Sequence, residues 1–120
     1  MKVLSIDPGQ TTGIAAYEGR ELSFTLTVSS RKLLSNGFLN KTMAMALPEI
    51  ILIEDVPKLK PDPHQLVLVA ELIRWFRVAA YETVLIQPSQ WKGFVKRVEI
   101  PGQHARDAAT MGKWWIENNE

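Results

Sequence analysis

The chain has 120 residues, 46% of them hydrophobic, which is the size and composition of a single domain over residues 1–120 with one core. The lack of cysteine excludes disulfides and thiolate metal sites, so any metal must be bound by oxygen or imidazole ligands. The net charge of only +1 gives no overall nucleic-acid signal, and we expect neither a membrane span nor a signal peptide.

The first thirty residues predict three strands joined by tight turns. Residues 2–7 alternate apolar and polar side chains before Pro8-Gly9, residues 13–17 form a second short run, and residues 21–29 alternate strongly. The segment 18–20 predicts the hairpin turn between the second and third strands. Because the connections are short, we expect these strands to pair antiparallel.

The rest of the chain predicts helices that alternate with strands. In chain order we expect a helix over 30–47, a buried strand over 49–55, a helix over 64–81, a short strand over 83–87, a loop or short helix over 88–98 and a helix over 104–117. Asn36-Gly37 interrupts the first helix and Pro48 ends it. Strands joined through helices should pair in parallel. The predicted fold class is therefore α/β, a mixed five-stranded sheet with helices on both faces.

The helix predicted over residues 64–81 has an apolar arc wider than packing on one sheet requires. The arc consists of Leu66, Leu68, Val69, Leu72, Ile73, Trp75, Phe76 and Ala79. A surface helix needs only one apolar stripe, so the extra width predicts a second packing surface such as a partner subunit.

Basic residues outnumber acidic ones between Val56 and Arg97. The seven basic residues are Lys58, Lys60, Arg74, Arg77, Lys92, Lys96 and Arg97, against the three acids Asp62, Glu71 and Glu82. Such a surface can contact phosphates. A solvated basic face explains the same charges equally well.

Two acidic residues end two of the predicted strands. Asp7 stands at the carboxyl end of the first strand and Glu54 at that of the buried strand, while strand alternation sends Asp55 to the opposite face. Ligands of open α/β sheets gather at the carboxyl ends of strands. If the two strands are parallel neighbours, the carboxylates repel each other, and a divalent cation such as magnesium removes the conflict. The alternative for each acid is structural, a turn cap for Asp7 and a solvated strand end for Glu54.

His104 and Asp107 form a second pair of this kind. They are three residues apart on the last predicted helix, so they lie on adjacent turns of one side, at the edge of the apolar face that should pack on the sheet. An imidazole there can bind a metal or transfer a proton. The structural alternatives are a surface histidine and an aspartate that favours the helix dipole. Neither alternative explains why acids end two buried strands and a His/Asp pair stands on a third element.

Three segments of the sequence resemble the motifs of the RuvC-like Holliday junction resolvases, a branch of the RNase H-like nuclease superfamily. Val3-Leu-Ser-Ile-Asp-Pro-Gly-Gln-Thr-Thr-Gly13 is similar to the opening motif, and Ile51-Leu-Ile-Glu-Asp-Val-Pro57 to the second, whose glutamate corresponds to Glu54. His104-Ala-Arg-Asp-Ala-Ala109 is similar to the closing motif, in which an acid or histidine precedes an aspartate by three positions. The motifs occur in the family's order and span nearly the whole chain.

The resemblance implies an RNase H-like fold and a two-metal phosphodiesterase. Asp7, Glu54 and Asp107, with His104 as the fourth ligand, are the implied catalytic and metal-binding residues for two magnesium or manganese ions. It also implies a homodimer that cuts opposed strands of a four-way DNA junction, which agrees with the wide apolar arc of residues 64–81. The expected location is the cytoplasm of a bacterial cell or a phage-infected host. Lys92 and Lys96 are the first choices for phosphate contacts, followed by Lys58, Lys60 and Arg97.

The sequence departs from the family in ways that concern the substrate. The chain is shorter than the cellular resolvases, and residues 98–103 are brief where family members carry more basic and glycine-rich sequence. A compact form of this kind suits a bacteriophage-type resolvase that cuts branched DNA more broadly. The alternatives are a RuvC-like RNA-processing nuclease, a non-catalytic nucleic-acid-binding module, and an ATP-binding domain of the actin and sugar-kinase type. The last is an alternative because residues 6–13 also resemble the phosphate-binding hairpin of those ATPases.

Overall fold

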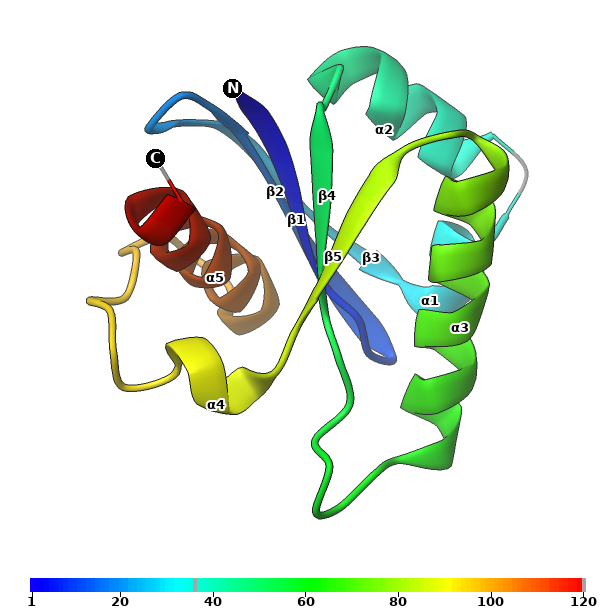
Figure 1. Ribbon diagram of the computed structural model, residues 1–120. Helices are drawn as coiled ribbons and strands as arrows, with labels where there is room; N and C mark the ends of the chain where they lie inside the picture. Colours follow the sequence, from blue (N-terminus) through cyan, green and yellow to red (C-terminus); the bar gives the residue numbers. More distant parts are fainter. Residues whose placement is uncertain (36, 120) are drawn as a thin grey trace.

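The computed structural model of the chain describes residues 1–35 and 37–119 (Figure 1). Its elements in chain order are β1 Lys2–Asp7, β2 Thr11–Glu18, β3 Glu21–Ser29, α1 Ser30–Leu33, α2 Phe38–Ala46, β4 Ile50–Glu54, α3 Pro63–Val78, β5 Glu82–Ile86, α4 Pro88–Trp91 and α5 Gln103–Asn119. No helix in the described part of the chain is long and apolar enough to cross a membrane.

The five strands form one sheet in the order β3-β2-β1-β4-β5. The first three strands pair antiparallel, as their short turns predicted, and β4 pairs in parallel with both β1 and β5. Ile6 pairs with Ile53, so the next residues, Asp7 and Glu54, end neighbouring strands at the same edge of the sheet. The two strands are therefore parallel neighbours, which is the condition that the predicted acidic site required.

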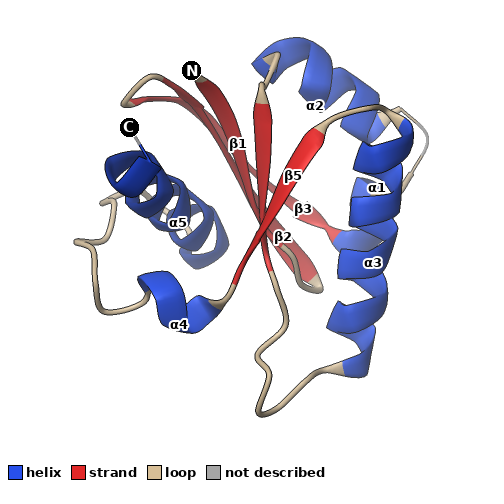
Figure 2. Cartoon of the chain, in the orientation of Figure 1, coloured by secondary structure: helices blue, strands red, loops and turns tan. Residues whose placement is uncertain are grey.

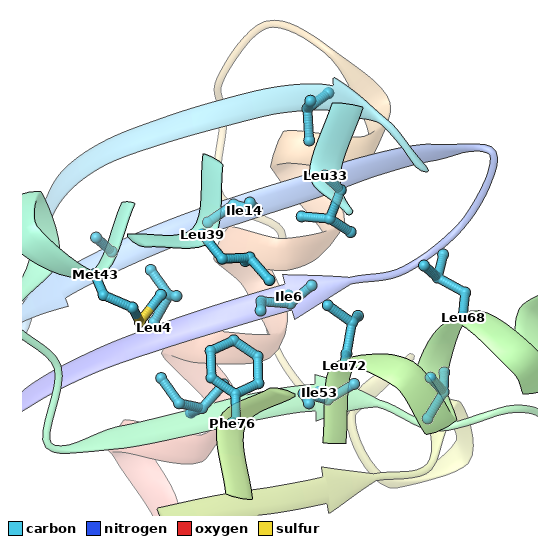
Figure 3. Packing of buried hydrophobic residues seen from close by; sticks show 14 of the residues in the cluster. Leu4, Ile6, Ile14, Leu33, Leu39, Met43, Ile53, Leu68, Leu72 and Phe76 are labelled. Atoms are coloured by element: carbon cyan, nitrogen blue, oxygen red, sulfur yellow. The ribbon is translucent and has the colours of Figure 1, made fainter. Parts of the chain in front are cut away.

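Helices cover both faces of the sheet, with α1, α2 and α3 on one side and α4 and α5 on the other (Figure 2). Strand alternation decides which residue packs on which side. Leu4 and Ile6 of β1, with Ile53 of β4, pack against the leucines and Phe76 of the α1–α3 layer (Figure 3). Val3 of β1 and Leu52 of β4 pack on the α5 side.

The same alternation places the acids. Asp7 and Glu54 follow the parity of Val3 and Leu52, so both belong to the face on which α5 lies. Asp55 lies one residue beyond β4, and its Oδ2 accepts a hydrogen bond from Gln87 Nε2 at 3.1 Å. Sequence parity and strand order together bring the two acids to the helix that carries His104 and Asp107.

The helix predicted over residues 30–47 is wrong as one element, because the structure has the two short helices α1 and α2 there. Gly37 has a φ of +84°, a left-handed conformation that breaks the helical path and that glycine adopts without steric cost. Asn36, the other half of the predicted interruption, lies outside the described residues. Leu47, with a φ of +45°, ends α2 one residue before Pro48.

Helix α3 ends at Val78, three residues earlier than predicted. Ala80 has a φ of +63°, and the amides of Ala80 and Tyr81 donate to the carbonyls of Arg77 and Phe76. This is a Schellman turn built on alanine where glycine is usual. The Tyr81 ring packs edge-on against Phe76, with centroids 6.1 Å apart. Tyr81 therefore packs on the apolar side of α3, although it lies beyond the end of the helix.

Candidate active site

All four residues predicted to form the site line one cavity of ≈ 320 Å³ at the carboxyl ends of β1 and β4. Asp7 and Glu54 come from the two strands, and His104 and Asp107 from the first turns of α5. Pro8, Gly9, Gln10, Thr11, Lys92 and Gln103 complete the lining. Glu54 and Asp107 are buried, and Asp7 and His104 are partly exposed. The structure thus brings together residues that are up to a hundred positions apart.

Helix α5 reaches the acids because β2 carries a glycine where the helix begins. A Cβ atom at Gly13 would lie 1.9 Å from the carbonyl oxygen of His104, so only a residue without a side chain fits there. Two buried hydroxyl groups then fix the helix on the sheet: Ser5 Oγ donates to the Ala108 carbonyl at 2.7 Å, and Tyr17 Oη donates to the Ala109 carbonyl at 2.6 Å. These contacts determine how far His104 and Asp107 extend over the strand ends.

Three carboxyl groups that are largely buried and close together set the electrostatics of the cavity. Burial, followed by repulsion from Glu54 and Asp107, raises the pKa of Asp7 to about 8. Burial also raises the pKa of Glu54, and the nearby Lys92 opposes this shift. Asp7 and Glu54 each shift the pKa of the other, so the two carboxyl groups lie close together in the cavity.

Glu54 has a second partner, which the sequence analysis missed. The buried Trp91 donates from Nε1 to Glu54 Oε2 at 2.8 Å. Helix α4 presents this indole, and a bond from the Gln87 amide to Gln90 Oε1 at 2.8 Å closes its first turn. Gln87 is also the partner of Asp55, so the end of β4 holds the start of α4. Pro88 at the first helical position was the available sequence signal for this helix.

Asp107 carries an unsatisfied buried atom. Its Oδ1 has no hydrogen-bond partner among residues 1–35 and 37–119. Arg97 Nη2 lies 3.7 Å away, which is an ion pair but too long for a hydrogen bond. A buried carboxylate oxygen without a partner costs free energy that a bound cation would recover. This orphaned oxygen and the oxygen-rich lining fit a divalent metal.

The four side chains do not form a closed metal cage. Within the described residues, no three His, Asp or Glu side chains are grouped closely enough to hold an ion as they stand. Glu54 accepts a hydrogen bond from the Trp91 indole, and Asp107 forms an ion pair with the Arg97 guanidinium.

The predicted phosphate-binding residues separate into three places. Lys92 lines the acidic cavity itself. Lys96 and Arg97 line a different hollow of ≈ 500 Å³ beside α5, together with Tyr17 and Arg20, although Arg97 also reaches Asp107. Lys58 and Lys60 are exposed in the loop between β4 and α3, which starts at the strand end that carries Glu54. Lys92 is thus the only one of the five that lines the acidic cavity.

No family model and no curated protein sequence matches the chain. Solved structures do. RuvC of Thermus thermophilus in complex with Holliday junction substrate is similar with a TM-score of 0.72 and 13% identity, over 92% of this chain and 88% of that one. A second structure of Thermus thermophilus RuvC is similar with a TM-score of 0.70 and 15% identity, over 92% and 90% of the two chains.

A fowlpox virus resolvase bound to substrate Holliday junction DNA is also similar. Its TM-score is 0.59 at 11% identity, over 97% of this chain and 99% of the viral one. These likenesses confirm the predicted fold: the chain has the RNase H-like architecture of RuvC, with a five-stranded mixed sheet between helices.

Proposed function

We propose that the chain is a magnesium- or manganese-dependent endonuclease that cuts branched DNA, with the four-way junction as its substrate. The observation that carries this proposal is the convergence of Asp7, Glu54, His104 and Asp107 on one cavity at the carboxyl ends of parallel strands. Oxygen and imidazole donors of this kind suit divalent cations that act on phosphates. Two structures with the same fold hold Holliday junction DNA, which supports the choice of substrate.

Asp7, Glu54 and Asp107, with His104, are the residues that would hold two metal ions. Two such ions supply an activated water and neutralise charge on the leaving oxygen of a phosphodiester. The protein contributes orientation: Trp91 holds Glu54 Oε2, and the Gly13 contact holds α5 close to the strands. Lys92 lines the same cavity and is placed to pair with a phosphate beside the one that is cut.

We also propose a homodimer through the outer side of α3, since two opposed cuts need two sites. Leu68, Val69, Leu72 and Phe76 of the predicted arc are buried in the chain's own core. Val67 and Val78 on the outer side are 60% and 83% exposed. Beside Val78, the side chains of Leu34 and Trp75 line a groove of ≈ 610 Å³. Exposed apolar side chains next to a groove favour association with a second copy.

The cleavage test uses a synthetic four-way junction, a matched linear duplex and single-stranded RNA, each with magnesium, manganese or chelator. We expect paired, symmetric nicks in the junction only, and only with metal. Asp7→Asn should abolish cutting, whereas Asp62→Asn should not, because Asp62 is an exposed acid that caps α3 and asparagine caps equally well. If Asp7→Asn cuts as well as the parent, the proposed mechanism is wrong.

Other results of this test would assign the alternative functions. Cutting of single-stranded RNA in place of the junction would indicate an RNA-processing nuclease.

The proposed dimer is tested by sedimentation equilibrium, which should give twice the chain mass for the parent and the mass of one chain for Val78→Glu. A parent protein that sediments as a monomer in the presence of junction DNA would contradict the dimer.

A further inference from the structure

The turn that follows α4 carries an exposed aromatic side chain two residues after Lys92, which lines the acidic cavity. Phe94 is 75% exposed, although phenylalanine is among the more often buried residue types. Its backbone is held in place, because its amide donates to the Trp91 carbonyl at 3.1 Å and Gly93 takes the left-handed conformation that this turn needs. Trp91 in turn is bonded to Glu54. Phe94 therefore sits one tight turn away from a residue that contacts the site.

The charges around Phe94 indicate which kind of partner covers it. Lys92 and Lys96 stand two positions before and after it, and both are exposed. Lys92 also lines the cavity with Asp7 and Glu54. A partner that meets this turn must offer negative charge to two lysines and a flat apolar surface to a phenyl ring. Nucleic acid with an unstacked base has both, in its phosphates and in the face of the base.

We propose that Phe94 stacks on an unpaired or unstacked base at the branch point, with Lys92 and Lys96 on the flanking phosphates. This inference rests on the proposed function and adds the means by which the site selects branched DNA. A linear duplex offers no free base face, since its bases are already stacked, and unstacking a step has a free-energy cost. At a branch point stacking is already interrupted. Contact with Phe94 therefore favours binding of the junction over the duplex, whereas the two lysines contact phosphates in both.

The test measures binding without cutting. Fluorescence anisotropy with the Asp7→Asn chain gives dissociation constants for a four-way junction and for a linear duplex of the same sequence. Adding Phe94→Ala should weaken junction binding roughly 5- to 150-fold, the range for loss of one aromatic–base stack, and duplex binding by less than about 2-fold. Phe94→Trp should preserve junction binding, and Phe94→Leu should not, because leucine is apolar but has no flat face.

The matched control is Met45→Ala, which removes another exposed apolar side chain, on α2 away from the cavity, and should leave both constants unchanged. If Phe94→Ala weakens both DNAs equally or neither, the stacking inference is overturned while the nuclease proposal stands. If Phe94→Leu binds as tightly as the parent, simple apolar contact replaces stacking and the inference is likewise overturned. Failure of the unsubstituted chain to prefer or cut the junction would instead reject the proposed function itself.

Discussion

The contact between β2 and α5 allows one sharp test of how the site is built. Gly13→Ala adds a single methyl group, whose carbon would lie 1.9 Å from the His104 carbonyl oxygen, 2.3 Å from its carbonyl carbon and 2.8 Å from the Ala105 nitrogen. All three atoms belong to the backbone, so no side-chain rotation relieves the clash. To restore ordinary contact at 3.4 Å, the first turn of α5 must move away by about 1.5 Å.

The expected loss of stability follows from what holds α5. The bonds from Ser5 and Tyr17 to its backbone, and the close packing of Gly112 on the Tyr17 ring, resist sliding, so the helix tilts and these contacts weaken. Overpacking of a core costs about 1–3 kcal/mol, and a strained hydrogen bond about 1 kcal/mol more. We expect Gly13→Ala to lower the free energy of unfolding by about 2–4 kcal/mol. Urea denaturation followed by circular dichroism measures this.

The same movement displaces His104 and Asp107 relative to Asp7 and Glu54. A misplacement of about 1 Å in a catalytic constellation typically costs about 100-fold in rate. Junction cutting should therefore fall by about that factor under conditions where the variant is still folded. The control is Gly19→Ala, where an added Cβ meets no described atom within 4 Å and only the φ of +60° is unfavourable. It should cost about 1–2 kcal/mol and leave cutting unchanged.

Two results would refute this reasoning. A Gly13→Ala chain as stable as the parent would mean that α5 does not approach β2 this closely. A chain that is destabilised but cuts at the parental rate would mean that the start of α5 is not part of the site.

Three further predictions concern single groups. In the absence of metal, Asp7 has a pKa of about 8 in the folded chain against 3.8 unfolded, so the free energy of unfolding should fall as pH rises from about 4 to about 8. Denaturation in chelator should show a larger fall for the parent than for Asp7→Asn, in which the buried Glu54 still contributes; an equal fall in both would contradict it. Trp91→Phe removes the donor to Glu54 and should weaken manganese binding about 10-fold or more, as measured by calorimetry. The control is Trp115→Phe, whose side chain is buried outside the cavity and which should leave manganese binding unchanged. Equal effects of the two substitutions would show that Trp91 has a packing role only. Ala80→Gly relieves a positive φ and should raise the free energy of unfolding by about 1 kcal/mol in urea, unless the turn is more relaxed than its φ indicates.

Local patterns in the sequence were sufficient to predict the strands and the acids that stand at their ends. Alternation with a period of two decides the face of every residue in a strand, so Asp7 and Glu54, at the ends of their strands, could be assigned to faces before any tertiary information. Short turns and helical connections likewise predicted which strands are antiparallel and which parallel. His104 and Asp107 followed from their spacing on a helix.

Local patterns failed where a residue's role depends on a distant partner. Trp91 looked like one more apolar residue in a loop or short helix, since nothing near it in the sequence reveals that its indole meets Glu54, thirty-seven positions earlier. Lys92 and Lys96 looked equivalent, and only the path of the chain after α4 places one in the acidic cavity and the other beside α5.

The apolar arc of α3 shows the same limit. Its width indicated two packing surfaces, but it took the fold to show that four of its side chains are buried in the chain's own core. The sequence by itself thus predicted the strands, their parallel or antiparallel pairing and the acids at the strand ends, because these depend on periods of two and on the lengths of the connections. Only the tertiary structure decided the second partner of Glu54, the orphaned Asp107 oxygen and the fit of α5 on Gly13, because contacts between distant segments leave no periodic trace in either segment alone.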